Sequence, residues 1–455
     1  MADVFETKAK FNPKRDFNFA HLPHSDAAFD DALKKARNGE RLSVDDGVAL
    51  MTAIDPDRKA KVLELADQRR KEMVGDDVTF VACMNLNLTT ACTVGCLFCN
   101  YKDSAHLFQI NSTTEHDGFT RTIEETKKLA QAGAERGIYE ICSVSGLHPA
   151  LVLNEEHRQI LEKNPVNYKA PKEFHKDPGT YVDQIKALKI GGVHIHSMTP
   201  EEAYHAKRGT DWSYREVYET LKEAGLDSVP GTAAEILVDE VRDVICPGKI
   251  NTAEWVKGME GAAEAGLPMT STIMYGHVDN ACHRVMHMDV VRNLQDRTKN
   301  ITEFVPLKFV HPNTPLFQLG MVDGSSTAAE DELMIAVSRL FLDNIENIQV
   351  SWVKYGDTLG KHLLNCGGND FMGTLLNEEI TQRAGGGYGS FRSFADYYDM
   401  ITSIGRIPVE RSTDYRLKRV VEAHPGQPIG PTLGLYADGT PLLSEEETKA
   451  LRSLP

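Results

Sequence analysis

The chain has 455 residues, enough to enclose a large core, so we expect one large catalytic body with appendages. Its 66 acidic side chains outnumber 50 Lys and Arg side chains, and the formal net charge of −16 repels phosphate backbones and excludes nucleic acid as an expected partner. Eight cysteines without a paired framework, no charged-then-apolar amino-terminal segment and no long apolar span predict a cytoplasmic protein with no membrane association.

Residues 28–75 carry apolar side chains at helical spacing and contain few helix breakers. This pattern predicts an amino-terminal helical layer, which we place at residues 1–76.

From Val78 onward, short apolar runs alternate with helical stretches, which is typical of repeated β-α units around a parallel sheet. Two helix starts are marked by capping boxes, at Thr199–Glu202 and at Ser213–Glu216. Seven or eight units predict an α/β fold, a (β/α) barrel over residues 77–416, followed by a short carboxyl-terminal extension over 417–455. The expected strands are Val78–Ala82, Ile138–Val144, Gly192–Ser197, Asp227–Val229, Thr270–Met274, Val305–Val310, Ile348–Val353 and a weaker one near Phe371.

Three cysteines, Cys92, Cys96 and Cys99, follow the first expected strand in C-x-x-x-C-x-x-C spacing. Cysteine thiolates hold iron–sulfur clusters, and three of them leave one iron of a four-iron cubane open to a ligand. A zinc site completed by His106 is the alternative, but no second paired motif exists among the other cysteines. The spacing therefore favours an iron–sulfur cluster.

In barrels of this kind the chemistry lies at the carboxyl ends of the strands, so residues directly after the expected strands are candidates. Ser145 and Gly146 follow the second strand, where small residues let the backbone approach a ligand; a simple turn is the alternative. His194 and His196 lie two apart and point to one face of the third strand. We take His196 as a lining residue, although strand histidines are often only part of a core.

Glu235 follows the fourth strand within a run of small and apolar residues, where a carboxylate needs a partner. It would hold an amino group or ribose hydroxyls. Arg242 would bind a carboxylate through both of its terminal nitrogens, and a surface pair with Asp239 is the alternative.

Tyr275 and His277 end the fifth strand and His311 ends the sixth, where a phenol and imidazoles serve as hydrogen-bond partners or proton relays. We therefore predict Tyr275, His277 and His311 as catalytic candidates. Asn369 is a further candidate for binding a polar substrate edge.

The cysteine motif, with Phe98 before the third cysteine, resembles the signature of the radical S-adenosylmethionine (SAM) enzymes. The resemblance implies one [4Fe-4S] cluster, whose open iron binds the methionine end of SAM, and a 5′-deoxyadenosyl radical formed by one-electron cleavage. It also implies SAM contacts from the loop after the second strand, Ser145 and Gly146, and Tyr101 keeps an aromatic ring beside the cluster. We place His196, Glu235 and Arg242 among the residues that bind SAM, with the carboxylate of an amino-acid substrate as the alternative ligand of Arg242.

Further motifs, among them Pro230–Leu237, Ile245–Ile250, Met274–His277 and Asn347–Lys354, resemble the family of tyrosine-using subunits of FO synthase. The likeness spans roughly residues 28–416. It implies that L-tyrosine is cleaved between Cα and Cβ and that its 4-hydroxybenzyl fragment joins 5-amino-6-(D-ribitylamino)uracil. A second radical SAM subunit of FO synthase and a ferredoxin or flavodoxin reductant are the implied protein partners.

Some positions differ from the usual pattern of that family, including Asn100, Tyr101 and Ser145, and residues 153–180 look like an insertion that forms a lid or a surface excursion. The rival within the class is an aminofutalosine synthase of menaquinone biosynthesis. A non-catalytic iron–sulfur electron carrier or a zinc-stabilised scaffold is the alternative from another class.

Overall fold

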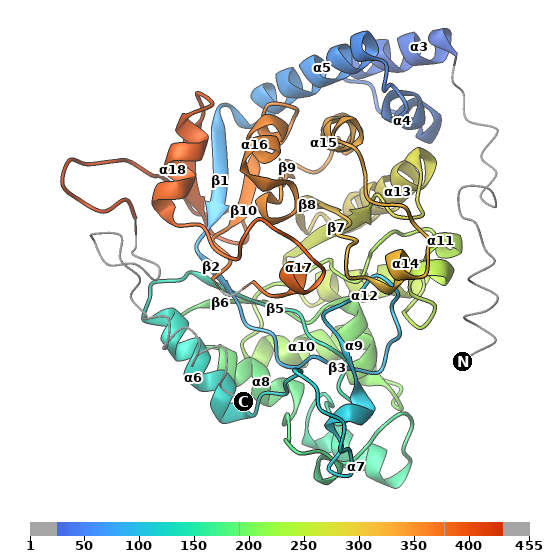
Figure 1. Ribbon diagram of the computed structural model, residues 1–455, viewed down its shortest axis with the longest axis vertical. Helices are drawn as coiled ribbons and strands as arrows, with labels where there is room; N and C mark the ends of the chain where they lie inside the picture. The colour runs from blue at the N-terminus through green and yellow to red at the C-terminus, as the bar shows by residue number, and fades with distance from the viewer. Residues whose placement is uncertain (1–24, 191, 377, 431–455) are drawn as a thin grey trace.

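The computed structural model describes residues 25–190, 192–376 and 378–430. Within these residues the first three helices are α3 (Asp26–Arg37), α4 (Val44–Met51) and α5 (Pro56–Val74). Each begins at a side-chain cap, and Ser43 and Asp46 form a reciprocal capping box. The helices expected in residues 28–75 are therefore present, and Figure 1 shows them together at one end of the molecule. Residues 1–24 of the predicted amino-terminal layer lie outside the described residues.

The central strands are all parallel to their neighbours. Strand β2 (Cys83–Asn85) pairs with β5 (Glu140–Ser143), and β5 pairs with β6 (His194–Ser197). Strand β7 (Met269–Tyr275) pairs with β8 (Ile301–Lys308), and β8 pairs with β9 (Asn347–Ile348). Strand β10 (Asp370–Gly373) pairs with β1 (Asp77–Val81), which continues into β2 after one residue.

Single bridges connect these groups of strands. His196 pairs with Ser228, Val229 pairs with Met269, and Gln349 pairs with Asp370. Residues 228 and 229 thus stand where the fourth strand was expected, and the pairings run from β2 around to β10 and back to β1. The α/β class with parallel strands is confirmed, and the pairings are consistent with the predicted eight-unit barrel.

Helices follow the strands and cover them on the outside (Figure 1). The two capping boxes expected from the sequence are present at the starts of α9 and α10. The helices of this outer layer are α6 (Ile123–Ala134), α8 (Tyr181–Leu188), α9 (Pro200–Lys207), α10 (Tyr214–Ala224), α11 (Asp239–Ile245), α12 (Thr252–Glu264), α13 (Ala281–Thr298), α15 (Ala328–Phe341), α16 (Trp352–Leu364) and α18 (Phe394–Thr402).

The expected seventh strand is shorter than predicted. Only Asn347 and Ile348 form β9, and the chain enters α16 at Trp352, although residues 348–353 read as one apolar run. Trp352 and Val353 are buried against the rest of the core from the helix. A short apolar run does not distinguish a strand from a buried helix start.

Short elements surround the carboxyl ends of the strands. After the cysteine motif come β4 (Asp103–Ser104), which pairs with β3 (Ala91–Cys92), and η1 (Ala105–Phe108). The predicted insertion contains α7 (Glu155–Lys163) and η2 (Pro171–Glu173), and a bridge joins Phe174 to Gln109. The later short helices are α14 (Pro315–Gln318) and α17 (Ile380–Arg383).

Strand β11 (Ile407–Arg411) pairs in parallel with β1 on the edge away from β10. The guanidinium of Arg411 is buried and donates to Asp370 at 2.5 Å and to Glu303 at 3.3 Å. Strand β12 (Lys418–Val420) pairs antiparallel with β11, so pairing continues beyond the predicted boundary at residue 416. Residues 431–455 of the predicted extension lie outside the described residues.

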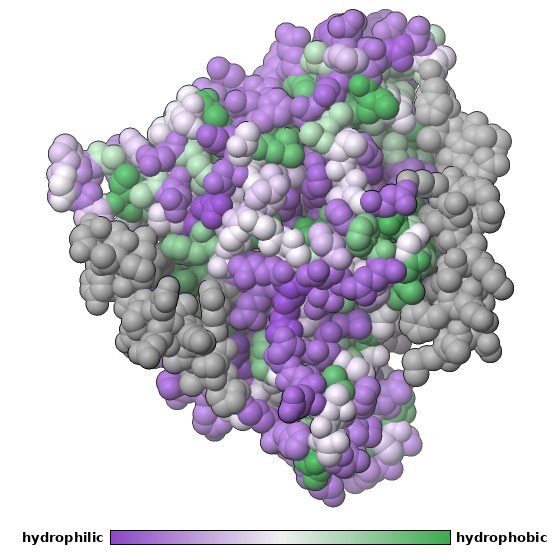
Figure 2. Space-filling model, viewed as in Figure 1, coloured by the Kyte–Doolittle hydropathy of each residue, from purple (hydrophilic) through white to green (hydrophobic). Residues whose placement is uncertain are grey.

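Polar side chains predominate on the face of the molecule in Figure 2, with only scattered apolar ones. Within the described ranges, no helix combines the length and the apolar character needed to cross a membrane.

Candidate active site

A cavity of about 230 Å³ opens at the carboxyl ends of the strands. The three cysteines line it, and so do four more of the residues proposed from the sequence. These residues are Cys92, Cys96, Cys99, Tyr101, Ser145, Gly146 and Glu235. Segments more than 140 positions apart in the chain therefore meet around one space.

The cysteine loop is held in place by backbone hydrogen bonds on both sides. The amide of Leu97 donates to the carbonyl of Ile245, and the carbonyl of Leu97 accepts from the amide of Leu316. Cys96 is buried, whereas Cys92 and Cys99 are half-buried. Burial raises the pKa of the Cys99 thiol, and the backbone amides of Lys102 and Tyr101 partly offset this.

The three thiols fit an iron–sulfur cluster, because they are the right kind of donor and share one cavity. In the described part of the chain no three His, Cys, Asp or Glu side chains converge closely enough to hold a single metal ion. Thiolates on a cubane bind separate irons and do not need to converge on one point. His106, the fourth ligand of the zinc alternative, is exposed and its Nδ1 lies 2.8 Å from the Ser104 hydroxyl.

The loop after β5 packs directly on the backbone that leads into the cysteine loop. The Ser145 hydroxyl accepts from the amide of Leu88 at 2.7 Å, and the amide of Gly146 donates to the carbonyl of Thr89 at 2.9 Å. A Cβ on Gly146 would lie 2.4 Å from the carbonyl oxygen of Ala91. Only glycine permits this approach beside Cys92.

Glu235 has the partner that its apolar surroundings require. Lys249, which sequence reasoning did not single out, places its Nζ 2.6 Å from the Glu235 carboxylate and 5.4 Å from the centre of the Phe98 ring. Burial lowers the pKa of Lys249, but the surrounding acidic groups, of which Glu235 contributes most, together outweigh burial and raise the pKa of this lysine. The cavity thus contains a fixed ion pair beside the cysteine loop.

A second carboxylate in the cavity, Glu202, was read from the sequence only as part of a helix cap. It does cap α9 through Thr199, and it also accepts from the amide of Ser145 at 3.3 Å. Burial raises the pKa of Glu202 to about 7, although the hydrogen bonds from Thr199 lower it. Because the capping box explained Glu202, nothing in the sequence indicated that it would line the cavity.

His196 and Arg242 lie outside the cavity lining. The Nδ1 of His196 is 2.7 Å from the Ser228 hydroxyl, and burial lowers the pKa of this histidine to about 3. The buried Arg242 donates to backbone carbonyls, including that of Ile250 at 2.5 Å, and so fixes the loop that carries Glu235. Its alternative partner Asp239 instead accepts from Thr252.

Tyr275 is fully buried and lies one side chain behind the cavity. Its hydroxyl donates to Asp331 at 2.8 Å and lies 3.0 Å from the hydroxyl of Tyr355. The other oxygen of Asp331 accepts from Lys308 at 2.7 Å, and Lys308 lines the cavity. Tyr275 therefore reaches the site through Asp331 and Lys308.

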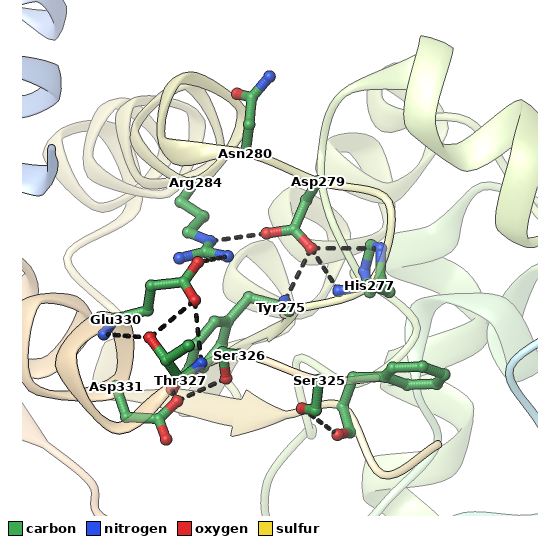
Figure 3. Close-up of polar contacts among 12 residues, drawn as sticks. Tyr275, His277, Asp279, Asn280, Arg284, Ser325, Ser326, Thr327, Glu330 and Asp331 are labelled. Atoms are coloured by element: carbon green, nitrogen blue, oxygen red, sulfur yellow. Dashed lines mark hydrogen bonds and ion pairs between the residues drawn. The ribbon is translucent and has the colours of Figure 1, made fainter. Parts of the chain in front are cut away.

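His277 belongs to a satisfied turn at the end of β7 (Figure 3). Its Nε2 donates to the carbonyl of Met274 at 3.0 Å, and its Nδ1 accepts from the amide of Val278 at 2.8 Å. Although burial opposes ionisation, Arg284 and His277 hold the pKa of the neighbouring Asp279 down at about 2. His277 lines a separate cavity of about 430 Å³.

His311 and Asn369 also lie outside the lining of the main cavity. The His311 ring packs on Phe317 with 4.8 Å between ring centres, and burial lowers the pKa of this histidine. Asn369 is buried between Arg339 and Asn347, with which its side chain forms hydrogen bonds of 2.6 and 2.9 Å. Its contacts are those of a core residue.

Comparison with known proteins identifies the family. The model of the radical SAM superfamily matches residues 86–291, and that of the CofH/MqnC C-terminal region matches residues 298–424. A 5-amino-6-(D-ribitylamino)uracil–L-tyrosine 4-hydroxyphenyl transferase of Haloarcula marismortui is 61% identical over 97% of this chain and 100% of its own length. The chain belongs to this transferase family. The relative of the same name in Methanospirillum hungatei is 40% identical over 84% of this chain and 96% of its own length.

Solved structures confirm the fold at low identity. The hydrogenase maturase HydG has a TM-score of 0.60 at 15% identity and covers 91% of this transferase-family chain and 80% of its own. Methylornithine synthase (PylB) has a TM-score of 0.57 at 17% identity and covers 83% of this chain and 97% of its own. The fold class expected from the sequence is therefore confirmed.

Proposed function

We propose that the chain joins the 4-hydroxybenzyl fragment of L-tyrosine to 5-amino-6-(D-ribitylamino)uracil in the biosynthesis of the deazaflavin FO. The observation that carries this proposal is the 61% identity to a transferase of that name over nearly the full length of both chains. The function is that of a radical SAM transferase. Both relatives named above are transferases of this name, so neither supports the aminofutalosine synthase or the electron-carrier alternative.

Cys92, Cys96 and Cys99 would hold one [4Fe-4S] cluster, since all three line the cavity from a single loop. When bound, the cluster and SAM supply the one-electron cleavage that generates the 5′-deoxyadenosyl radical. Ser145, Gly146 and the Glu235 carboxylate would position SAM. Their support is that they line the same cavity as the thiols.

The protein's contribution is to orient the reactants and to keep other hydrogen donors away. Apolar side chains such as Val144, Leu147 and Phe309 line the cavity and would help to exclude water when the reactants are bound. Lys249 holds Glu235 in place, and Asp331 holds Lys308 in place. Such fixed groups keep reacting atoms in line, which is what a short-lived radical requires.

The remaining candidates act through neighbours in this proposal. Tyr275 supports Lys308 through Asp331, and Arg242 fixes the loop of Glu235. His196, His277 and His311 support the wall and rim of the barrel from outside the cavity lining. A second radical SAM subunit, a ferredoxin or flavodoxin reductant and a cytoplasmic location belong to the same proposal.

A product assay tests the function. The protein, reconstituted anaerobically, is incubated with SAM, reductant, L-tyrosine and the diaminouracil, and each component is omitted in turn. Mass spectrometry should detect 5′-deoxyadenosine and a hydroxybenzyl–uracil adduct only in the complete mixture. Deoxyadenosine without any adduct would contradict the assignment of the substrates and leave the radical chemistry intact.

A further inference from the structure

Lys354 is a lysine of the cavity wall that lacks a carboxylate partner. It lies in the first turn of α16, and its Nζ donates to the Thr381 hydroxyl at 2.8 Å. Two other lysines of the cavity, Lys249 and Lys308, are each ion-paired to a carboxylate. Among the residues that the structure describes, Lys354 has no such pair within 4 Å, so part of its hydrogen-bonding capacity is open to a ligand.

Glu378, which follows β10 and is not among the residues that line the cavity, has an unpaired carboxylate oxygen where Lys354 has an unpaired charge. It is 4% exposed, and its Oε1 accepts from the amide of Thr381 at 2.8 Å. Its Oε2 is buried and has no hydrogen-bond partner in the described part of the chain. A buried carboxylate oxygen without a donor is costly, so an unpaired one points to a missing partner.

Thr381 lies between the two charged groups and contacts both of them. Burial lowers the pKa of Lys354, and the carboxylate of Glu378 is the main group that opposes this shift. Two opposite charges that served only the stability of the core would gain most by direct contact. Here Lys354 and Glu378 each form a hydrogen bond with Thr381 and no ion pair with each other.

A ligand that carries an anionic and a cationic group side by side satisfies both residues. An anion alone would leave Glu378 without a donor, and a cation alone would leave Lys354 without an acceptor. A free amino acid has both groups, because its α-carboxylate and its α-ammonium group are bonded to the same carbon atom.

We propose that Lys354 and Glu378 bind the α-carboxylate and the α-ammonium group of the L-tyrosine substrate. This inference rests on the proposed function. The methionine end of SAM has the same chemistry, but the residues assigned to SAM follow the second and fourth strands. Lys354 and Glu378 follow the seventh and eighth strands, β9 and β10, which favours the second amino acid of the reaction.

The test compares Lys354→Met and Glu378→Gln with the wild-type holoenzyme. Lys361→Met is the matched control, because Lys361 lies on the same helix, is partly exposed and donates a side-chain hydrogen bond to Ser403. Adduct formation gives KM for L-tyrosine, and calorimetry gives Kd for L-tyrosine, tyramine and 3-(4-hydroxyphenyl)propanoate. Tyramine lacks the carboxylate, and the propanoate lacks the ammonium group.

Lys354→Met should raise KM and Kd for L-tyrosine about 10- to 100-fold and leave the Kd of tyramine unchanged. Glu378→Gln should weaken L-tyrosine binding and leave the propanoate unchanged. A structural role alone would move all three ligands together. In both variants the iron content and the Kd for SAM should match those of Lys361→Met.

Three outcomes overturn the inference. They are unchanged L-tyrosine binding in both variants, equal weakening of all three ligands, and a loss confined to SAM, which would assign the site to its methionine end. Failure of the proposed function is recognised separately, because the wild-type enzyme would then form no adduct. The calorimetric comparison still decides the inference in that case.

Discussion

Replacing Gly146 by alanine tests how the loop after β5 positions the cysteine loop. The added Cβ would lie 2.4 Å from the carbonyl oxygen of Ala91 and 3.0 Å from its carbonyl carbon. Real Cβ atoms essentially never lie closer than 3.0 Å to another heavy atom. The backbone beside Cys92 must therefore move by at least 3.0 − 2.4 = 0.6 Å. Overpacking of this kind costs about 1–3 kcal/mol, and a ligand shifted this far binds its cluster poorly.

We expect Gly146→Ala to lower the iron and sulfide content after anaerobic reconstitution and to reduce SAM cleavage per chain by about tenfold or more. Gly95→Ala is the matched control, because Gly95 lies between Cys92 and Cys96 and a Cβ there meets no atom within 4 Å. It should retain both properties. Wild-type iron content and cleavage in Gly146→Ala would refute the claim that this contact sets the position of Cys92.

Three further predictions concern charged groups of the site. Glu235→Gln should lower the free energy of unfolding by about 3 kcal/mol, because Lys249 loses its partner. Adding Lys249→Met should recover most of the lost stability, and urea unfolding in which the two losses add would contradict this coupling. The folded-state pKa of Glu202, about 7, exceeds its ordinary 4.5, so stability falls as pH rises between these values. Glu202→Gln should reduce this pH-dependent loss in the free energy of unfolding by on the order of 3 kcal/mol. A variant whose unfolding midpoint depends on pH as the wild type's does would contradict the prediction. Asp331→Asn frees Lys308 and should reduce kcat/KM about 10- to 100-fold at unchanged iron content, whereas wild-type kinetics would exclude a positioning role.

The part of the site that could be predicted from the sequence is the part with local signals. The cysteines occupy one short motif, and Ser145, Gly146 and Glu235 directly follow expected strands, where parallel barrels collect their functional residues. All of them line the cavity. Lys249 and Lys354 lie within motifs that carry the family resemblance, but neither was predicted as a site residue, because a lysine after or within a helix normally reads as a solvated surface residue.

Tyr275 shows the limit of the strand-end rule. The rule predicts the end of the sheet at which a residue lies, but neighbouring residues of a strand point to opposite faces. Met274 lines the cavity, whereas Tyr275 contacts Asp331 of the helical layer. The sequence alone could not decide which of the two faced inward, because both belong to a buried run.

The most direct test of the account follows the carbon atoms of tyrosine. L-Tyrosine labelled with carbon-13 at Cβ, or in a parallel reaction at Cα, is converted by the reconstituted enzyme, and the hydroxybenzyl–uracil adduct is examined by mass spectrometry. The account predicts that the adduct carries the Cβ label and not the Cα label, because the bond between these atoms breaks. An adduct that retains the Cα label, or a labelled product without the uracil, would contradict it.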